Sequence, residues 1–524
     1  MKQIAPESPV DLSLTTPVLR ASAPRRTWWF AISVAAALSQ LPGLIPYPGG
    51  AIHWLFVLGV VALLPPLCLA LFEARTAAAG RLFLVVLSCY AILHFSFELV
   101  VYETGFRMTR DTGAFVQSFW NLANGNGFQT TIDGQYSGVA PASISHFARH
   151  NSPILFVGYL FYRLFGSMVG LIVLKTLLWF LAGWLALRLA KLAFPGDENR
   201  ILVILVPFVL LIQVPLAFTT DFDETVFYPP IVLWLALSYK REARMQFVLA
   251  CLLLAAVKET TVLILFVLGI LALWRGKRWE GGVALVTGAL AALISFGLVI
   301  PAASPTASSP FFQDVSAALA GLRPADVGTY WLQLLGAWAA LPLGSLYSLL
   351  GLPEILMNSF FAGPMPWTLP LTTRYQVLVD AVLFVAAIDA LPRAARWCEE
   401  RLPVAPARKV LLSLLFTAAV CGLYRAGLPL HALGECLAGN WHQDVACLNV
   451  VARDTRPVIA DYSITGYFAE RRDLWTSGLP LPEAAWQKAE WVVSKKRSPV
   501  PLPLVGLWDT VCSSQNLAVL RRAR

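Results

Sequence analysis

The segment Arg110–Asn121 carries the residue best suited to acid–base chemistry in this chain. Asp111 follows a long apolar run, so we expect its carboxylate just outside a membrane span. Phe115 and Phe119 share one helical stripe with Trp120 beside them, which indicates an amphipathic helix lying along the bilayer surface. Asp111 would then face lipid-borne substrates, where a carboxylate can take a proton. The alternative is that Asp111 only caps the helix.

A second acidic group lies in Thr219–Glu224, between two apolar runs. Its carboxylates belong to Asp221, Asp223 and Glu224, and we expect them at the outer interface near the Asp111 loop. Carboxylates that lie close together shift each other's pKa and can share a proton or a metal ion. The alternative is a solvated turn at a membrane boundary, which needs no function.

The polar stretch 102–152 is too long for a simple connection, and long loops at membrane surfaces often carry function. It contains Asp133 and Arg149. It also contains two histidines, His146 and His150, and these two are candidates for binding a substrate. The alternative interpretation of the segment that begins at His150 is helix initiation.

Charged residues also interrupt the apolar stretch Phe247–Trp274, at Lys258 and Glu259. Ionisable residues within such stretches are costly, so they are usually paired or line a pathway. The two residues therefore indicate a functional position. The alternative is an internal ion pair that holds a helical hairpin together.

Arg374 and Tyr375 follow the Pro-rich segment Pro364–Pro370, just before another apolar run. The guanidinium of Arg374 presents a fork of donors that suits a phosphate group. The alternative is that Arg374 extends toward lipid head groups.

Motifs for several other chemistries are missing from the sequence. There is no Walker A sequence, no H-E-x-x-H and no G-x-S-x-G, and the eight cysteines form no zinc pattern. These absences argue against ATP-driven work by this chain.

The composition defines the class of protein that must position these residues. Hydrophobic residues make up 57% of the 524 positions and charged residues 14%, which a soluble core cannot accommodate. The net charge of +9 comes from short basic clusters between apolar runs, which is typical of cytoplasmic loops and not of a nucleic-acid surface. We therefore expect a polytopic membrane protein in a lipid bilayer, with no nucleic-acid partner.

The apolar runs predict a mainly α transmembrane bundle of roughly 11–13 membrane segments, several of them too short to cross alone. The expected runs are Trp28–Ile45, Ile52–Phe72, Leu82–Val101, Met168–Leu189, Ile201–Phe218, Val226–Tyr239, Gln246–Val257, Thr260–Trp274, Gly281–Ile300, Tyr330–Leu350, Ile355–Phe361, Tyr375–Ala390 and Val410–Leu423. With a cytoplasmic N-terminus, the basic loops fall inside and the stretches that carry Asp111 and Asp223 fall outside.

Three parts follow from this pattern: a cytoplasmic tail at 1–26, a transmembrane module at 27–427 with the external loop 102–152, and a domain at 428–524. The last part is polar, with short alternating runs, so we expect a small α/β domain outside the cytoplasm. Cys436, Cys447 and Cys512 fall in it. An oxidising compartment would allow one disulfide among them and leave an odd thiol.

Five of these segments together resemble a bacterial family of polytopic membrane proteins labelled domain of unknown function 2079, which is similar to the GT-C glycosyltransferases. The matching segments are Arg110–Gly125, His150–Pro153, Asp221–Glu224, Val257–Glu259, and Leu352–Asn358 followed by Arg374-Tyr375. Two positions depart from the family pattern, which usually has histidine where this chain has Asp223 and Arg374.

The resemblance implies a GT-C-like fold in the bacterial inner membrane and transfer of a sugar from a polyprenyl phosphate to an acceptor at the outer face. The acceptor would be an envelope glycan, lipid or protein. Asp111 matches the general base of related enzymes, and Lys258 and Arg374 become candidates for binding the donor phosphate. A single displacement would invert the anomeric centre.

The resemblance also suggests roles for the remaining candidates. His146 and His150, with Asp221, Asp223 and Glu224, would bind the acceptor. Alternatively, His146 or His150 would join Asp111 and Asp221 around a divalent ion such as Mg or Mn. The lipid tail or pocket would be lined by the other candidates, which are Phe115, Phe119, Trp120, Tyr375 and Glu259.

Two further functions stay open. A transporter or flippase would also use a bundle of many spans with Lys258 and Glu259 along the substrate path. A non-catalytic scaffold would use the C-terminal domain to bind envelope partners.

Overall fold

Helices make up most of the structure, as the long apolar runs predict. The computed structural model describes residues 79–104, 108–196, 205, 222–304, 324–338, 340–360, 374–401, 441–477, 479–496 and 507–523. The tail at 1–26, the expected runs at 28–45, 52–72, 201–218 and 410–423, Asp221 and Cys436 lie outside these residues.

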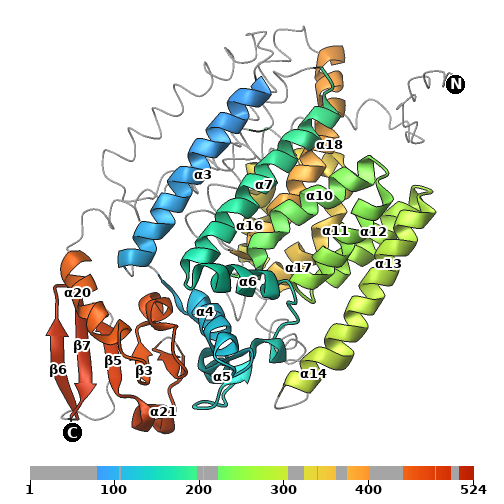
Figure 1. Cartoon of the computed structure of the whole chain (residues 1–524). Helices are drawn as coiled ribbons and strands as arrows, with labels where there is room; N and C mark the ends of the chain where they lie inside the picture. Colours follow the sequence, from blue (N-terminus) through green and yellow to red (C-terminus); the bar gives the residue numbers. More distant parts are fainter. Residues whose placement is uncertain are drawn as a thin grey trace, which may run out of the picture.

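The α-helices form a bundle with a smaller α/β domain beside one end of it (Figure 1). Their bounds are α3 (Ala79–Thr104), α4 (Arg110–Ala123), α5 (Thr131–Tyr136), α6 (Leu155–Phe165), α7 (Val169–Ala193), α10 (Tyr228–Lys240), α11 (Arg244–Val257), α12 (Thr261–Trp274), α13 (Arg278–Ala292), α14 (Ile300–Ala303), α16 (Pro324–Ala337), α17 (Leu352–Phe360), α18 (Val377–Arg401), α20 (Trp441–Ala452) and α21 (Glu483–Lys488).

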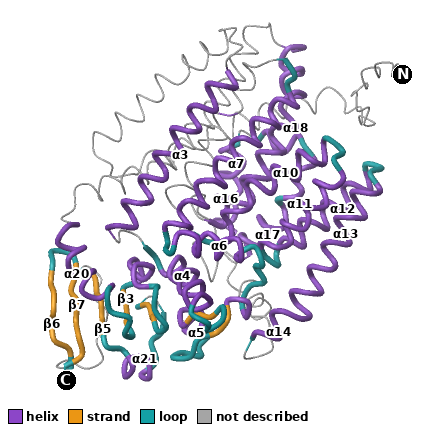
Figure 2. The backbone as a smooth tube through the Cα atoms, in the orientation of Figure 1, coloured by secondary structure: helices purple, strands orange, loops and turns teal. Residues whose placement is uncertain are grey.

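Short helical turns and strands connect and complete these helices (Figure 2). The 3-10 helices are η2 (His146–Ala148), η4 (Glu224–Phe227), η6 (Leu341–Gly344), η7 (Leu346–Leu350), η9 (Arg374–Gln376) and η10 (Tyr462–Phe468), and η5 (Leu293–Val299) is a π-helix. The strands are β1 (Gln129–Thr130), β2 (Ile144–Ser145), β3 (Val458–Ala460), β4 (Leu474–Thr476), β5 (Trp491–Lys495), β6 (Trp508–Ser513) and β7 (Leu517–Arg522).

Three of the described helices are long and apolar enough to cross a membrane: Phe83–Glu103, Val169–Ala193 and Arg278–Ala303. The last of these is continuous through α13, η5 and α14, so it extends the run expected at 281–300. Shorter apolar helices include α11 and α12, which match the runs expected at 246–257 and 260–274.

Glycines bring α12 and α13 close together. A Cβ atom at Gly269 would lie 2.5 Å from Leu285 Cγ, and one at Gly281 would lie 2.6 Å from Leu273 Cγ. Small residues at such crossings let two membrane helices approach until their backbones nearly touch. The close approach fixes the hairpin of α12 and α13. Lys258 and Glu259 lie just before the start of α12.

The single span expected at 330–350 is wrong. Helix α16 ends at Ala337, Ala340 adopts a positive φ of 54°, and the chain continues as the 3-10 helices η6 and η7. Pro342, within η6, lacks a backbone donor and so disfavours a continuous α-helix. An apolar run does not distinguish a spanning helix from buried turns of this kind.

An ion pair that the sequence patterns did not predict joins α3 to α7. Lys175 Nζ lies 2.8 Å from Glu98 Oε1, and His94 Nε2 lies 3.5 Å from the same oxygen. The ring of His94 also stacks on Trp179. Because Lys175 and His94 are almost fully buried, the pair holds the two helices in one register.

The C-terminal domain contains a five-stranded sheet in the order β4-β3-β5-β7-β6. Strand β3 pairs in parallel with β4 and β5, whereas β7 runs antiparallel to β5 and β6. Two of the short alternating runs in this domain, Pro457–Asp461 and Glu490–Ser494, contain the strands β3 and β5, as their pattern predicts. Buried Ile459, Trp475 and Val492 contribute to its core.

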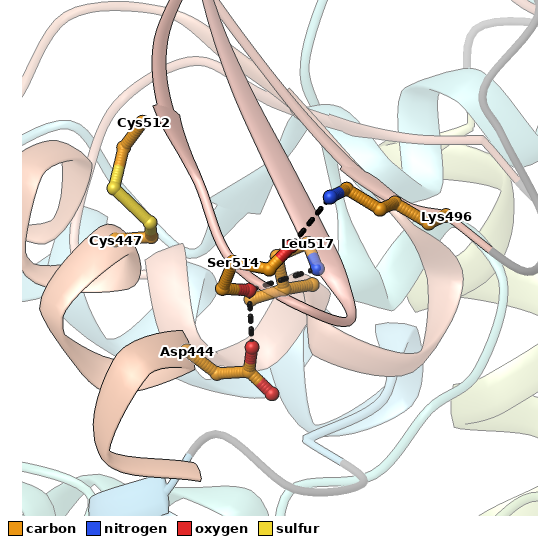
Figure 3. Close-up of a disulfide and its surroundings, with 6 residues drawn as sticks. All are labelled: Asp444, Cys447, Lys496, Cys512, Ser514 and Leu517. Carbon is orange, nitrogen blue, oxygen red and sulfur yellow. Dashed lines mark hydrogen bonds between the residues drawn. A yellow bond between two sulfur atoms is a disulfide. The ribbon is translucent and has the colours of Figure 1, made fainter. Parts of the chain in front are cut away.

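A disulfide joins Cys447 on α20 to Cys512 on β6 (Figure 3). The prediction of one disulfide in this domain is therefore confirmed. Beside the disulfide, the hydroxyl of Ser514 donates to Asp444 and accepts from Leu517 N at 3.0 Å, so the helix and the end of the sheet are also joined by hydrogen bonds.

Replacing Cys447 and Cys512 together by serine is expected to destabilise the C-terminal domain by about 4 kcal/mol, because the bridge closes a loop with a sequence separation of 65. Differential scanning fluorimetry of the purified full-length protein, with and without reductant, measures the change. Wild-type protein in reductant should match the double variant, and an unchanged melting temperature in both would contradict the prediction.

Residues 108–152 of the long loop fold together and bind the C-terminal domain through hydrogen bonds. Gln117 Nε2 on α4 donates to Arg472 O at 2.9 Å, and Gln135 Nε2 on α5 donates to Thr476 O at 2.8 Å. The amide of Thr476 in turn donates to Gln135 Oε1 at 3.0 Å. Side-chain amides thus satisfy backbone groups along β4, the edge strand of the sheet.

The apolar face of α4 packs against protein, so the expectation that this face contacts the bilayer surface is wrong. Nine of its 14 residues are buried, including Phe115 and Phe119 on the apolar stripe. Phe119 packs among the rings of Phe128, Tyr162 and Phe222. The amphipathic pattern was correct, but other protein elements and not lipid cover both faces of the helix.

Candidate functional site

The charged site is built where helices begin or are interrupted. Asp111 lies in the first turn of α4, and Asp223 caps η4 by accepting a hydrogen bond from Thr225 N at 2.8 Å. Lys258 has extended backbone dihedral angles, −163° and 150°, that separate α11 from α12. Arg374 begins η9. The site therefore gathers side chains from four helix ends that are far apart in the sequence.

Four side chains of the site are partly exposed, and we call them the outer row: Asp111, Arg374, Lys258 and His150. Their exposed fractions are 26%, 29%, 20% and 28%. A ligand can reach all four groups. The outer row thus combines one carboxylate, two cations and one imidazole.

Behind the outer row lie three buried carboxylates, which we call the inner row: Asp223, Glu224 and Glu259. Their exposed fractions are 2%, 6% and 2%. Such burial of a charge requires a partner of opposite charge or several hydrogen bonds.

Each inner carboxylate holds one member of the outer row. Arg374 Nη1 lies 3.4 Å from Asp223 Oδ2, and Lys258 Nζ lies 3.1 Å from Glu224 Oε1. His150 Nδ1 lies 2.9 Å from Glu259 Oε1, whose other oxygen accepts from Asn151 N at 3.0 Å. The inner row therefore fixes the directions of the cations and of the imidazole.

Arg374 also joins the two acidic loops. Its Nη1 lies 3.0 Å from Asp111 Oδ2, in addition to its contact with Asp223. The expectation that acids of two separate loops converge is confirmed for Asp111 and Asp223. Asp221, which was expected in the same place, lies outside the described residues.

The two positions that depart from the family pattern contact each other. Asp223 and Arg374 form an ion pair of opposite charges. This contact gives both departures a shared physical explanation.

Neighbouring charges decide the ionisation of Glu224. Burial by itself would raise the pKa of this carboxyl, but the positive charge of Lys258, to which Arg374 adds, holds the pKa below its ordinary value. Glu224 is therefore an anion at neutral pH and forms a true ion pair with Lys258.

His150 is a neutral imidazole at physiological pH. Burial lowers its pKa, Lys258 lowers it further, and the carboxylate of Glu259 offsets only part of the effect. With Nδ1 directed at Glu259, the other ring nitrogen presents a lone pair to a ligand.

A second acid–imidazole pair, Asp133 with His146, lies next to the first. Asp133 Oδ2 lies 3.1 Å from His146 Nδ1, and its Oδ1 accepts from Arg149 Nη1 at 3.0 Å. The rings of His146 and His150 have centroids 5.8 Å apart. His146 Nε2 is buried and has no hydrogen-bond partner among the described residues. The sequence placed Asp133 and Arg149 in the same loop but gave no signal that they meet.

Asp133 stabilises the folded loop at neutral pH. Burial would raise its pKa, but His146 and Arg149 outweigh burial and hold the pKa well below its ordinary value. A depressed folded-state pKa contributes stability above the unfolded value of about 3.9, and this contribution is lost as pH falls below that value.

Asp133→Asn is expected to destabilise the protein by about 1–3 kcal/mol at pH 7, because the buried imidazole of His146 and the partly buried guanidinium of Arg149 lose their charged acceptor. Thermal unfolding measured between pH 3 and pH 7 checks this value. The variant should lose less stability than the wild type on acidification, and parallel curves for the two proteins would contradict the prediction.

Glu354 on α17 is a further acid of the site that the sequence patterns did not single out. Burial raises its pKa to about 7; Lys258 opposes this rise, and Glu259 adds to it. Among the residues that the structure describes, none forms an ion pair or a hydrogen bond with Glu354. The Leu352–Asn358 motif was the available signal, because it places a carboxyl group among apolar residues.

Two of the side chains proposed to line a lipid tail are buried in the protein. Phe115 is 5% exposed and Phe119 is fully buried, so neither presents a surface to a lipid tail in this conformation. Trp120 is partly exposed. Tyr375 lies beside Arg374, whose guanidinium is 5.4 Å from its ring centroid, and so belongs to the charged site.

Within the described ranges, no group of three or more His, Cys, Asp or Glu side chains has an arrangement that could hold a metal ion. The acids there are directed at Arg374, Lys258 and the histidines.

The fold and the site together define a helical membrane protein with a charged site at its helix ends and an appended α/β domain. The chain belongs to the family described as predicted membrane protein (DUF2079), whose model matches residues 106–424. The resemblance on the five segments is thereby confirmed. None of the curated proteins matches the chain.

Among solved structures, the chain is similar to ArnT from Cupriavidus metallidurans in the apo state. The TM-score is 0.45 and the sequence identity is 14%, over 83% of this chain and 98% of that chain.

Proposed function

We propose that the protein is a membrane glycosyltransferase that moves a sugar from a polyprenyl phosphate to an acceptor at the outer face of the cytoplasmic membrane. The observation that carries the proposal is the outer row, in which the accessible carboxylate of Asp111 contacts the accessible cation of Arg374, while Glu224, next in sequence to Asp223, holds a second accessible cation, Lys258. Sugar transfer from a phosphate needs such a set, because a base takes a proton while cations stabilise the departing phosphate.

Asp111 is the proposed base. It is the most exposed acid among the ion-paired carboxylates of the site, and it contacts Arg374 through only one of its oxygens. The second oxygen lies 3.7 Å from Arg110 Nε, too far for a hydrogen bond. An acceptor hydroxyl can therefore approach that oxygen.

Arg374 and Lys258 are the proposed phosphate ligands. Arginine offers two parallel donors to a phosphate, and lysine offers a compact charge. Both side chains are held from behind by Asp223 and Glu224, so little reorganisation is needed when an anion arrives.

The reaction is a single displacement. The acceptor oxygen forms a bond to the anomeric carbon as the bond from that carbon to the phosphate oxygen breaks, and the electron pair of the broken bond stays on the phosphate. The proton of the acceptor hydroxyl moves to Asp111. The anomeric configuration inverts, because no sugar–enzyme intermediate forms.

The outer-face location is part of the proposal, with the N-terminus in the cytoplasm. The disulfide in the C-terminal domain supports it, because disulfides persist in oxidising compartments. The acceptor is an envelope glycan, lipid or protein. A divalent ion such as Mg or Mn stays a separate proposal, for which metal dependence of the transfer is the test.

Purified protein in nanodiscs, incubated with radiolabelled polyprenyl-phosphate sugars and envelope extract, tests the function. Labelled product together with an equimolar amount of free polyprenyl phosphate supports it. Absence of both products across a panel of donor sugars would count against it.

A transporter or flippase is the second candidate, favoured by the buried group of Glu98, Lys175 and His94 on α3 and α7. Ionisable residues within membrane helices often line a path for a proton or substrate. Proteoliposomes distinguish the two functions, because a transporter moves labelled lipid-linked sugar across the bilayer without releasing polyprenyl phosphate.

A further inference from the structure

The C-terminal domain reaches the site through alternating arginine and tyrosine side chains. The guanidinium of Arg110 lies 4.9 Å from the ring centroid of Tyr462 and 5.2 Å from that of Tyr136. The guanidinium of Arg149 lies 3.8 Å from the Tyr136 centroid. The order of the stack is therefore Arg149, Tyr136, Arg110 and Tyr462, and only Tyr462 comes from the C-terminal domain.

Each arginine of the stack also contacts an acid at the site. Arg110 Nε lies 3.7 Å from Asp111 Oδ1, and Arg149 Nη1 lies 3.0 Å from Asp133 Oδ1. Arg110 Nε is buried and has no hydrogen-bond partner among the described residues. The two tyrosine rings are therefore the main contacts that hold the guanidinium of Arg110 beside Asp111.

Backbone contacts fix Tyr462 relative to Asp111. Gly466 N, on η10, donates to Met108 O at 2.7 Å, just before α4 begins. A Cβ atom at Gly113 would lie 3.3 Å from Gly466 N, so η10 packs directly against the first turn of α4. The start of η10 thus cannot move independently of the turn that carries Asp111.

We propose that Tyr462 is a positioning residue, so that the C-terminal domain is a working part of the site and not an independent appendage. Tyr462 holds Arg110, and Arg110 fixes the direction of the Asp111 carboxylate. The kinetic consequence of this inference rests on the proposed function, whereas the geometric consequence does not.

The kinetic test compares three variants of the full-length protein in nanodiscs. Tyr462→Leu removes the ring and is expected to lower kcat about tenfold with the donor KM nearly unchanged, because a base displaced by a fraction of an ångström loses its alignment. Tyr462→Phe keeps the ring and should restore the wild-type rate. The control is Tyr467→Leu, on the same 3-10 helix but outside the stack, and it should transfer sugar at the wild-type rate.

The geometric test needs no activity. Carbodiimide-driven amidation of Asp111, followed by mass spectrometry, should become several-fold faster in Tyr462→Leu than in wild type or Tyr462→Phe. Exposed Asp509 on β6 serves as the internal reference. If the wild type transfers no sugar to any acceptor, the proposed function fails while this labelling still decides the role of Tyr462.

A second variant, Arg110→Lys, distinguishes loss of the contact from misfolding of Tyr462→Leu. Arg110→Lys keeps the charge but loses the planar guanidinium, and it should produce the same change in labelling and in kcat. The double variant should show no further loss, because both residues act through one contact. Unchanged labelling in both single variants, or additive losses in the double variant, would overturn the proposal.

Discussion

Asp111→Asn is expected to abolish sugar transfer, lowering kcat by roughly a hundredfold to ten-thousandfold. The amide is nearly the same size as the carboxylate but cannot take the proton of the acceptor hydroxyl. Arg374 keeps its contact with Asp223, and Asp111 is 26% exposed, so the melting temperature should change little. Release of polyprenyl phosphate from the donor, measured at saturating acceptor, gives the rate.

Asp509→Asn provides the matched control, because Asp509 is exposed on β6 far along the chain from the site. That variant should transfer sugar at the wild-type rate. If Asp111→Asn also transfers at the wild-type rate, Asp111 has no part in the mechanism, and Glu354 becomes the next candidate because its pKa of about 7 suits proton transfer at neutral pH.

Lys258→Met should have the second large effect, acting on both stability and catalysis. It leaves the carboxylate of Glu224 buried without its cation, which costs about 3–5 kcal/mol. It also removes one stabilising charge from the departing phosphate, which is expected to lower kcat by roughly a hundredfold to a thousandfold. Thermal unfolding and donor kinetics measure the two effects separately.

The double variant Lys258→Met/Glu224→Gln separates them. Because this variant has no unpaired buried carboxylate at position 224, most of the lost stability should return. Transfer should stay low, because the cation that faces the phosphate is still missing. Recovery of transfer together with stability would show that Lys258 is only a structural partner of Glu224.

The motifs located most of the candidate site, but they did not show how it is arranged. Asp111, Asp223, Glu224, Lys258, Glu259 and Arg374 were found because charged residues beside or within apolar runs are rare. Their division into an accessible outer row and a buried inner row required the structure, since residues 111, 223, 258 and 374 are far apart in the chain. Asp133 and Glu354 were missed as members of the site because their sequence context resembles an ordinary polar loop and an ordinary helix start.

The amphipathic stripe of α4 shows where periodicity stops being informative. The spacing of Phe115 and Phe119 predicted a helix with one apolar face, and the helix forms as predicted. The same spacing does not say what covers that face. In the folded protein the rings of Phe222, Tyr162 and Phe128 cover it. Protein and lipid satisfy an apolar face equally well, so the spacing could not choose between them.

By itself, the sequence determined that the protein is a helical membrane protein with a small α/β domain, because the length and hydrophobicity of each segment are local properties. It also fixed which side chains carry charge. Only the tertiary structure decided that Asp111 and Asp223 share Arg374, that Glu224 holds Lys258, and that Tyr462 of the last domain reaches Arg110. Those contacts join segments up to hundreds of residues apart. The interaction between their charges becomes strong only once packing has excluded water from between them.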